Sequence, residues 1–312
     1  MIANKYQLLS KIGEGKFGKV YKGLDKKTGE YVAIKIESSM FDETCKGVKL
    51  LKRETMILNY LHGHHCRNIP LVYWYGMHQD FPTLVMPFYE LSLHAHIDSL
   101  WLDQSKQIES STILEVMRCM LDILENLHGH FVIHRDIKPD NFMISWTNTN
   151  KIKLTLIDFG LATVFVDDQK RHFPMKTERG DHIIGTPKYI SCHIHDGIEP
   201  SRRDDLISVG YIGLQMLVGG LPWPIIQNGP TIQNEPIENT TMYERTHIMH
   251  PLNQEYKHAK QDFLDKITNA LVSIEENTNE TILLQFIKSV HHLEFTESPN
   301  YTIAHSSVSA NG

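Results

Sequence analysis

Short runs of alternating apolar and polar side chains fill the first part of the chain. Residues 7–36 predict strands around the turn-forming residues 25–29, and residues 69–89 return to strand composition. Between them, residues 47–61 place leucine and isoleucine at helical spacing and predict a helix. The first part of the chain is therefore expected to form an antiparallel sheet with one helix.

Helical periodicity dominates after about residue 110. Thr112 and Glu115 fit a capping box, and apolar side chains at residues 113–127 form one helical stripe. The most apolar stretch, residues 207–226, contains Gln215 and two prolines, so it predicts a buried core helix rather than a membrane span. Most of this second part of the chain is expected to be helical.

These patterns predict an α+β fold with two lobes. Residues 1–88 would form the small antiparallel-sheet lobe with one helix, and residues 89–312 the larger, mainly helical lobe, with no separate regulatory tail. The chain of 312 residues is long enough for two cores, and 41% hydrophobic with 22% charged residues excludes wholesale disorder.

Charge narrows the class of ligand. The formal net charge of −6 argues against a nucleic-acid-binding protein. Residues 1–60 nevertheless hold 12 basic and 7 acidic side chains, which suits a polyanion such as a nucleotide but also fits a solvated basic face. The four cysteines form no C-x-x-C pair, and no signal peptide or membrane segment is recognised. We therefore expect an intracellular protein, cytoplasmic or nuclear.

A glycine-rich motif, G-E-G-K-F-G, occupies residues 13–18. Such a motif can open a dinucleotide-binding fold, and Glu37 stands about where a ribose-binding acid would follow. Here, however, the sequence continues as a strand and a hairpin instead of a helix. Glycines between two antiparallel strands favour a flexible cover whose amides lie over a triphosphate.

Lys35 and Glu54 form the second candidate. Lys35 ends the strand sequence V-A-I-K, where a lysine alone would usually be a surface residue. Glu54 lies on the apolar stripe of the predicted helix, and a carboxylate facing a core needs a cationic partner. We expect Lys35 to be that partner and to bind the α- and β-phosphates of the nucleotide.

The most specific signal is H-R-D-I-K-P-D-N at residues 134–141, followed by D-F-G at residues 158–160. In this order they match a phosphotransfer loop and a metal-binding turn. Asp136 would accept the proton of the substrate hydroxyl, and Lys138 would neutralise charge on the transferred phosphoryl group. The oxygens of Asn141 and Asp158 suit Mg²⁺.

Together these motifs resemble a eukaryotic-type protein kinase over nearly the whole chain. The lysine at position 138, two residues after Asp136, resembles the residue found there in the serine/threonine branch of that family. The segments at residues 185–189, 201–206 and 219–223, and S-C-H at residues 191–193, resemble the casein kinase 1 family, with the vaccinia-related kinases as nearest relatives.

The resemblance implies ATP and Mg²⁺ as cofactors, and a monomer that phosphorylates Ser and Thr of protein substrates, including sites with acidic residues upstream. It implies that Thr186 lies beside Asp136 and Lys138, that Met86 is the gatekeeper, and that Asp205 holds the catalytic-loop backbone. The catalytic set is Asp136, Lys138, Lys35, Glu54 and Thr186. The nucleotide-binding set is Ile12, Gly13, Gly15, Gly18, Val20, Ala33, Lys35, Met86 and Tyr89.

The sequence departs from the resembled family at Lys188, where the family has Arg, and at Gln227, where it has Lys. We therefore expect a weaker preference for substrates that already carry a phosphate. Two other function classes stay open: a pseudokinase that acts as a scaffold, and a kinase for small molecules. The first is disfavoured because none of the six residues that pseudokinases tend to lose is missing.

Histidines form two further groups. His62, His64, His65 and Cys66 are interpreted as a surface loop, with a metal site as the alternative. His193, His195, His291 and His292 are also expected at the surface.

Overall fold

The computed structural model describes residues 1–15, 18–37, 50–102, 107–149, 151–176, 183–223, 242–271, 278–302 and 305. The described residues form two compact units. Unit 1 comprises Met1–Ala95 and Asp140–Thr163, and unit 2 comprises His96–Pro139 and Val164–Gly312. The lobe boundary expected at residue 88 stays a prediction.

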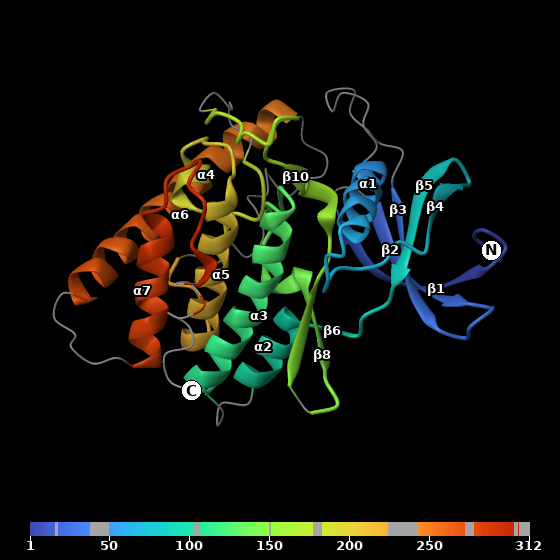
Figure 1. The fold of residues 1–312 in the computed structure, drawn as a ribbon, viewed down its shortest axis with the longest axis horizontal. Helices are drawn as coiled ribbons and strands as arrows, with labels where there is room; N and C mark the ends of the chain where they lie inside the picture. Colours follow the sequence, from blue (N-terminus) through green and yellow to red (C-terminus); the bar gives the residue numbers. More distant parts are fainter. Residues whose placement is uncertain are drawn as a thin grey trace. The chain divides into compact units, whose positions relative to one another are not determined.

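An antiparallel sheet forms most of unit 1 (Figure 1). One face of this sheet carries Val32, Ile34 and Val85, which pack with Ile2 and Tyr6 into a buried cluster. β-Branched side chains suit such a half-buried pleated surface. In spatial order the strands are β1 (Tyr6–Gly15), β2 (Gly18–Asp25), β3 (Tyr31–Glu37), β5 (Phe81–Pro87) and β4 (Trp74–His78).

Helix α1 (Leu50–Gly63) lies against β3 and β5. Its residue Leu51 packs with Leu84 and Met86 in a second cluster. The buried carboxylate of Glu37 accepts hydrogen bonds from the amides of Leu50 and Leu51, at 3.0 and 3.3 Å. The Glu37 carboxylate therefore binds the first two described amides of α1. The ribose-binding alternative for Glu37 is therefore wrong.

A smaller sheet completes unit 1. Strand β8 (Phe142–Trp146) lies between β6 (Leu91–Ser92) and β9 (Ile152–Leu156). In the antiparallel register of β8 and β9, Phe142 pairs with Leu156. The residues that precede β8 and follow β9 are thereby brought to the same end of the hairpin.

Helices form most of unit 2, and its core lies where α5 packs against α3 and α7 (Figure 1). Gly213 of α5 permits this close packing, because a Cβ there would lie 2.5 Å from Sδ of Met117 and 2.8 Å from Cδ1 of Leu283. The helices are α3 (Ser110–Gly129), α4 (Cys192–His195), α5 (Arg202–Val218), α6 (Met242–Leu271) and α7 (Asn279–His291). Helix α2 (Leu93–Leu102) and the short strands β7 (Val132–Ile133) and β10 (Thr163–Val164) complete the described elements, with single 3₁₀ turns at Pro139–Asn141 and Phe159–Leu161.

The expected α+β class is confirmed, since an antiparallel sheet with a helix precedes a mostly helical part. The capping box at Thr112 and Glu115 is wrong: α3 begins at Ser110 with Glu109 as N-cap, and the amide of Ile113 already bonds to the Glu109 carbonyl. Strand β4 begins at Trp74, so residues 71–73, which were expected to have strand structure, precede the strand. Helix α5 is a buried helix, and among the described residues no helix has the length and apolarity needed to cross a membrane.

Candidate active site

Strand registers in unit 1 gather the residues expected to bind the nucleotide. Val20 pairs with Lys35 across β2 and β3, and Ala33 pairs with Met86 across β3 and β5. Because directly paired residues and every second residue share a face, these four side chains project from the same face of the sheet. Ile12 lies on β1 with a largely exposed side chain, and Gly13 pairs with Val20.

The glycine-rich motif lies at the end of the β1–β2 pair, where Gly15 pairs with Gly18. Residues 16 and 17 lie outside the described part of the chain. Gly18 has a φ of +151°, and a Cβ on it would lie 2.2 Å from the carbonyl oxygen of Ile36. Only glycine tolerates that conformation and that close backbone approach. Gly18 therefore allows the start of β2 to pair closely with the end of β3.

Lys35 binds two carboxylates. Its Nζ lies 2.8 and 3.0 Å from the two oxygens of Glu54 and 2.8 Å from Oδ1 of Asp158. Burial alone would lower the pKa of Lys35, but the charges of Asp158 and Glu54 outweigh it and raise that pKa. Burial raises the pKa of Glu54, which the Lys35 ammonium opposes. The ammonium is therefore a fixed positive charge on the sheet face that carries Ala33 and Val20.

Glu54 also positions the turn that contains Asp158. The amide of Phe159 donates to Oε1 of Glu54 across 3.2 Å, and Asp158 adopts a left-handed conformation with a φ of 65°. A non-glycine residue in that conformation is uncommon and often marks a functional turn. The turn is thus fixed at both its carboxylate and its backbone.

Asn141 and Asp158 flank the β8–β9 hairpin. The amide of Ile157 donates to the carbonyl of Asn141 across 2.8 Å, so the segments carrying these two side chains run side by side. A carboxylate and an amide oxygen are hard donors of the kind that Mg²⁺ prefers. The donor set at this end of the hairpin therefore fits a magnesium ion.

Met86 lies near the end of β5, and Tyr89 follows this strand. Met86 is buried against Leu51 and Leu84, where it limits the space beside Ala33. Tyr89 is half-buried, and this burial raises the pKa of its hydroxyl to about 12. The Tyr89 phenol is therefore neutral at physiological pH.

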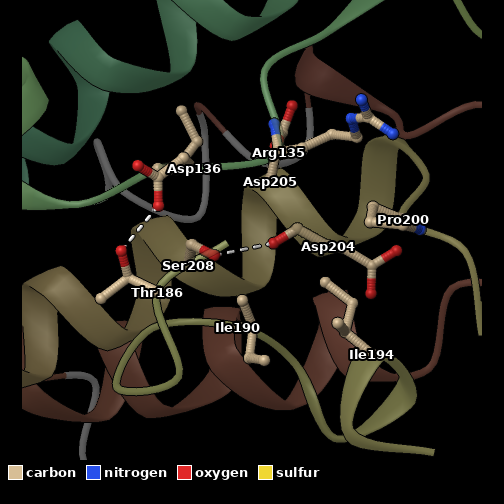
Figure 2. A pocket seen from close by; sticks show the side chains of 10 residues that line it. Arg135, Asp136, Thr186, Ile190, Ile194, Pro200, Asp204, Asp205 and Ser208 are labelled. Carbon is tan, nitrogen blue, oxygen red and sulfur yellow. Dashed lines mark hydrogen bonds between the residues drawn. The ribbon is translucent and has the colours of Figure 1, made fainter. Parts of the chain in front are cut away.

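In unit 2, Asp136, Lys138 and Thr186 form a closed triangle. The hydroxyl of Thr186 donates to Oδ1 of Asp136 at 2.7 Å and accepts from Nζ of Lys138 at 3.1 Å. Nζ of Lys138 lies 2.7 Å from Oδ2 of Asp136. Figure 2 shows Thr186 and Asp136 pointing toward each other from different segments. A carboxylate beside a cation and a hydroxyl is suited to accept a proton while negative charge develops nearby.

Asp205, near the start of α5, holds the backbone of the catalytic loop as the resemblance implied. Its carboxylate accepts from the amides of His134 and Arg135 at 2.8 and 2.9 Å, and from Nε2 of His128 at 3.0 Å. Burial would raise the pKa of Asp205, but these hydrogen bonds and nearby imidazole groups outweigh it and lower that pKa. The ionised carboxylate keeps Arg135 in its left-handed conformation, with a φ of 70°.

A small cavity lies beneath the catalytic loop (Figure 2). Asp204 lines it and serves as the N3 residue of the α5 capping box with Ser201. The hydroxyl of Ser208 donates to the backbone carbonyl of Asp204 at 3.0 Å and to that of Tyr189 at 2.8 Å. The cavity is therefore lined by residues of the catalytic loop, the segment after Thr186 and the start of α5.

Sequence reasoning missed three residues around the site. Tyr301 bonds to His128, and Lys260 bonds to the segment that follows Thr186. His195 has 4% of its surface exposed, so its expected surface position is wrong. It is buried because α4 packs against α6. His193 and His291 are half-buried, and only His292 of this group is exposed as expected. Periodicity offered no signal for the three missed side chains, since each makes its hydrogen bonds to segments that are distant in the sequence.

The surface-loop interpretation of the first histidine group holds for His64 and His65, which are exposed, but is wrong for His62, which lies in α1, and for Cys66, which is buried. His62 Nε2 lies 2.9 Å from the carbonyl of Pro70, and His64 Nδ1 lies 2.8 Å from that of Tyr60. Within the part of the chain that the structure describes, no group of three or more His, Cys, Asp or Glu is placed to hold a metal ion.

A comparison with protein-family models agrees with this geometry. The model described as a protein kinase domain matches residues 6–293. The match contains both the Lys35–Glu54–Asp158 cluster and the Asp136–Lys138–Thr186 triangle.

Proposed function

The chain belongs to the protein kinase family, and from this premise we propose that it transfers the γ-phosphoryl group of ATP to Ser and Thr hydroxyls of protein substrates. The observation that carries the proposal is the triangle of Asp136, Lys138 and Thr186. It combines a proton acceptor with a cation that can offset the charge of a transferred phosphoryl group. Resemblance to casein kinase 1 supports the Ser/Thr branch.

The remaining residues have complementary roles in this proposal. Lys35, oriented by Glu54, binds the α- and β-phosphates, and Asp158 and Asn141 hold Mg²⁺. When bound, Mg²⁺ neutralises phosphate charge. Met86 and Tyr89 border the adenine site, and the glycine-rich motif covers the phosphates.

The proposal extends to the kind of protein substrate that the chain selects. We expect protein substrates, including sites with acidic residues upstream, because Lys188 offers a cation in the segment after Thr186. Lysine acts on a phosphate as a point charge, whereas arginine grips it through two parallel hydrogen bonds. Preference for primed substrates should therefore be weaker than in casein kinase 1 enzymes. Gln227, which also bears on this preference, lies outside the described residues.

The test is transfer of labelled phosphate from ATP to casein, followed by identification of the phosphorylated amino acid. We expect Mg²⁺-dependent phosphoserine and phosphothreonine, and a loss of at least 100-fold in kcat for Asp136→Asn, because a proton acceptor of this kind contributes about 100- to 10,000-fold. The exposed Asp168→Asn is the matched control and should keep its activity.

Each alternative has its own result in this assay. Nucleotide binding without transfer to any protein would support the scaffold class. Transfer to small hydroxyl compounds but not to casein or a peptide library would support a small-molecule kinase. Retention of more than about a tenth of kcat by Asp136→Asn would contradict the assigned role.

A further inference from the structure

Lys260 of α6 is a fully buried lysine, with 0% of its surface exposed. Burying an ammonium is costly unless its protons find acceptors. Its acceptors among the described residues are two backbone carbonyls and an imidazole rather than a carboxylate. Nζ lies 2.7 Å from the carbonyl of Pro187, 2.6 Å from that of Ile190 and 3.0 Å from Nε2 of His195.

The hydrogen-bond network assigns the protonation state of His195. The side-chain Nδ2 of Asn253 donates to the carbonyl of His195 at 3.2 Å, which turns Oδ1 of Asn253 toward Nδ1 of the imidazole. Nδ1 must therefore carry the proton, and Nε2 is left as an acceptor. Burial and the Lys260 charge lower the pKa of His195 to about 3, which agrees with a neutral ring. All three protons of a charged Lys260 are then satisfied.

Aromatic rings surround the same ammonium. Nζ lies 5.4 Å from the ring centroids of Tyr211 and Trp223 and 5.5 Å from that of Tyr256. Ring faces at these distances attract a cation, and the attraction grows in a desolvated site. These contacts therefore offset part of the cost of burying the ammonium.

The segment held by Lys260 is the one that carries Thr186. Its other carbonyls are also fixed: Trp223 Nε1 donates to Lys188 at 2.9 Å, and the Ser208 hydroxyl donates to Tyr189 at 2.8 Å. The amide of Tyr189 in turn donates to the carbonyl of Thr186 at 2.8 Å. Because Lys260 bonds at both ends of residues 187–190, it ties the whole turn to α6.

We propose that Lys260 is a positioning residue for the substrate-binding turn: its ammonium fixes residues 187–190 and thereby holds the Thr186 hydroxyl against Asp136 and Lys138. This inference rests on the proposed kinase function. Lys260 does not touch the reacting groups. Its loss should therefore impair use of the protein substrate while leaving nucleotide binding intact.

Burial lowers the pKa of Lys260 to about 7, and a neutral amine has one donor too few for three acceptors. The turn should therefore loosen as the pH rises above 7. Burial and nearby charges shift the pKa values of four neighbouring groups away from the range of pH 7 to 9: Cys192 and Tyr211 upward, His195 and His291 downward. Tyr256 and the Lys257–Asp196 ion pair also face this region.

The effect on stability has the opposite sign. Because the folded-state pKa of Lys260 lies below its unfolded value, the unfolded chain binds more protons between about pH 7 and 10.5. This group therefore adds stability as the pH rises. A loss of peptide binding above pH 7 cannot be ascribed to unfolding driven by Lys260.

The experiment compares Lys260→Met, Lys260→Arg and the control Lys266→Met, an exposed lysine of the same helix. For Lys260→Met we expect at least a ten-fold higher KM for a peptide substrate and an ATP KM within two-fold of wild type, since charge-assisted bonds are lost only at the turn. In wild type the peptide KM should rise from pH 7 to 9. Lys260→Arg, which stays charged, should show no such rise.

An unchanged peptide KM in folded Lys260→Met, or equal changes in both KM values, would overturn the inference. If Lys260→Met does not fold, a flat wild-type peptide KM from pH 7 to 9 would overturn it. Hydrogen exchange at residues 186–190 separates this inference from the kinase proposal, because it needs no activity. Faster exchange in Lys260→Met supports the inference even if no phosphate transfer is found, and unchanged exchange contradicts it.

Discussion

The phenol of Tyr301 bonds to Nδ1 of His128, which lies 173 residues earlier in the chain. Nε2 of His128 donates to Asp205, whose carboxylate holds the amides of His134 and Arg135. The hydroxyl near the end of the described chain thus belongs to the same buried network as the catalytic-loop backbone.

Tyr301→Phe should weaken this network. Removing the hydroxyl leaves a buried imidazole nitrogen without its partner, which costs about 1–3 kcal/mol of unfolding free energy. Because His128 would then be free to tilt away from Asp205, kcat should fall more than the KM for ATP rises. Denaturant unfolding and steady-state kinetics would measure both. Tyr60→Phe, in a tyrosine that is 38% exposed, is the control; an equal effect of both changes would contradict the proposed coupling.

Glu54→Gln should reduce nucleotide binding. Glu54 has 1% of its surface exposed and shares Lys35 with Asp158. Glutamine keeps the shape but removes the charge, so Lys35 should shift toward Asp158 and away from its phosphate-binding position. We expect the ATP KM to rise about ten-fold or more, since hydrogen bonds to charged groups contribute about 1.5–3 kcal/mol.

The control for that change is Glu255→Gln, in an exposed glutamate of α6. It should leave the ATP KM unchanged. An ATP KM for Glu54→Gln within two-fold of wild type would show that Lys35 does not need Glu54 for its orientation.

The Lys35–Glu54 pair could be predicted from the sequence because its signal is local. A carboxylate in the apolar stripe of a helix must find a cation, and Lys35 lies on the strand that packs beside that helix. The strands near Lys35 were predictable for a similar reason, since alternation along a strand fixes which side chains share a face. The position of Thr186 beside Asp136 was predicted from the family resemblance instead, because no local sequence pattern indicates that contact.

Lys260, His195 and Tyr301 could not be predicted in this way. Lys260 lies in the polar stretch Q-E-Y-K-H-A-K-Q-D, where periodicity indicates a solvated helix face. It is buried because the carbonyls of Pro187 and Ile190, some 70 residues away, replace water around its ammonium. Contacts with backbone groups that are distant in the sequence cannot be predicted from the residues next to Lys260.

Gly18→Ala should destabilise unit 1. A methyl group on Gly18 would lie 2.2 Å from the carbonyl oxygen of Ile36, and its φ of +151° is strained for any other residue. We expect a loss of about 1–3 kcal/mol in unfolding free energy, typical of backbone strain. Gly13→Ala is the matched comparison for stability, because its new Cβ would meet only Val20 at 3.8 Å. Equal melting temperatures for the two variants would contradict this steric argument.

Acid should destabilise the fold through His195. Burial and the Lys260 charge lower the pKa of His195 to about 3, well below about 6.5 for an exposed histidine. The stability that this neutral ring contributes is therefore present above pH 6.5 and is lost as the pH falls toward 3. Between pH 7 and 5 the loss of unfolding free energy should be about 2 kcal/mol.

His195→Gln keeps an acceptor for Lys260 but cannot titrate, so its unfolding free energy should fall less over this range. Denaturant unfolding at pH 7 and pH 5 measures this difference, with exposed His292→Gln as the control for loss of an imidazole. Equal losses in wild type and His195→Gln would show that His195 is not the group responsible.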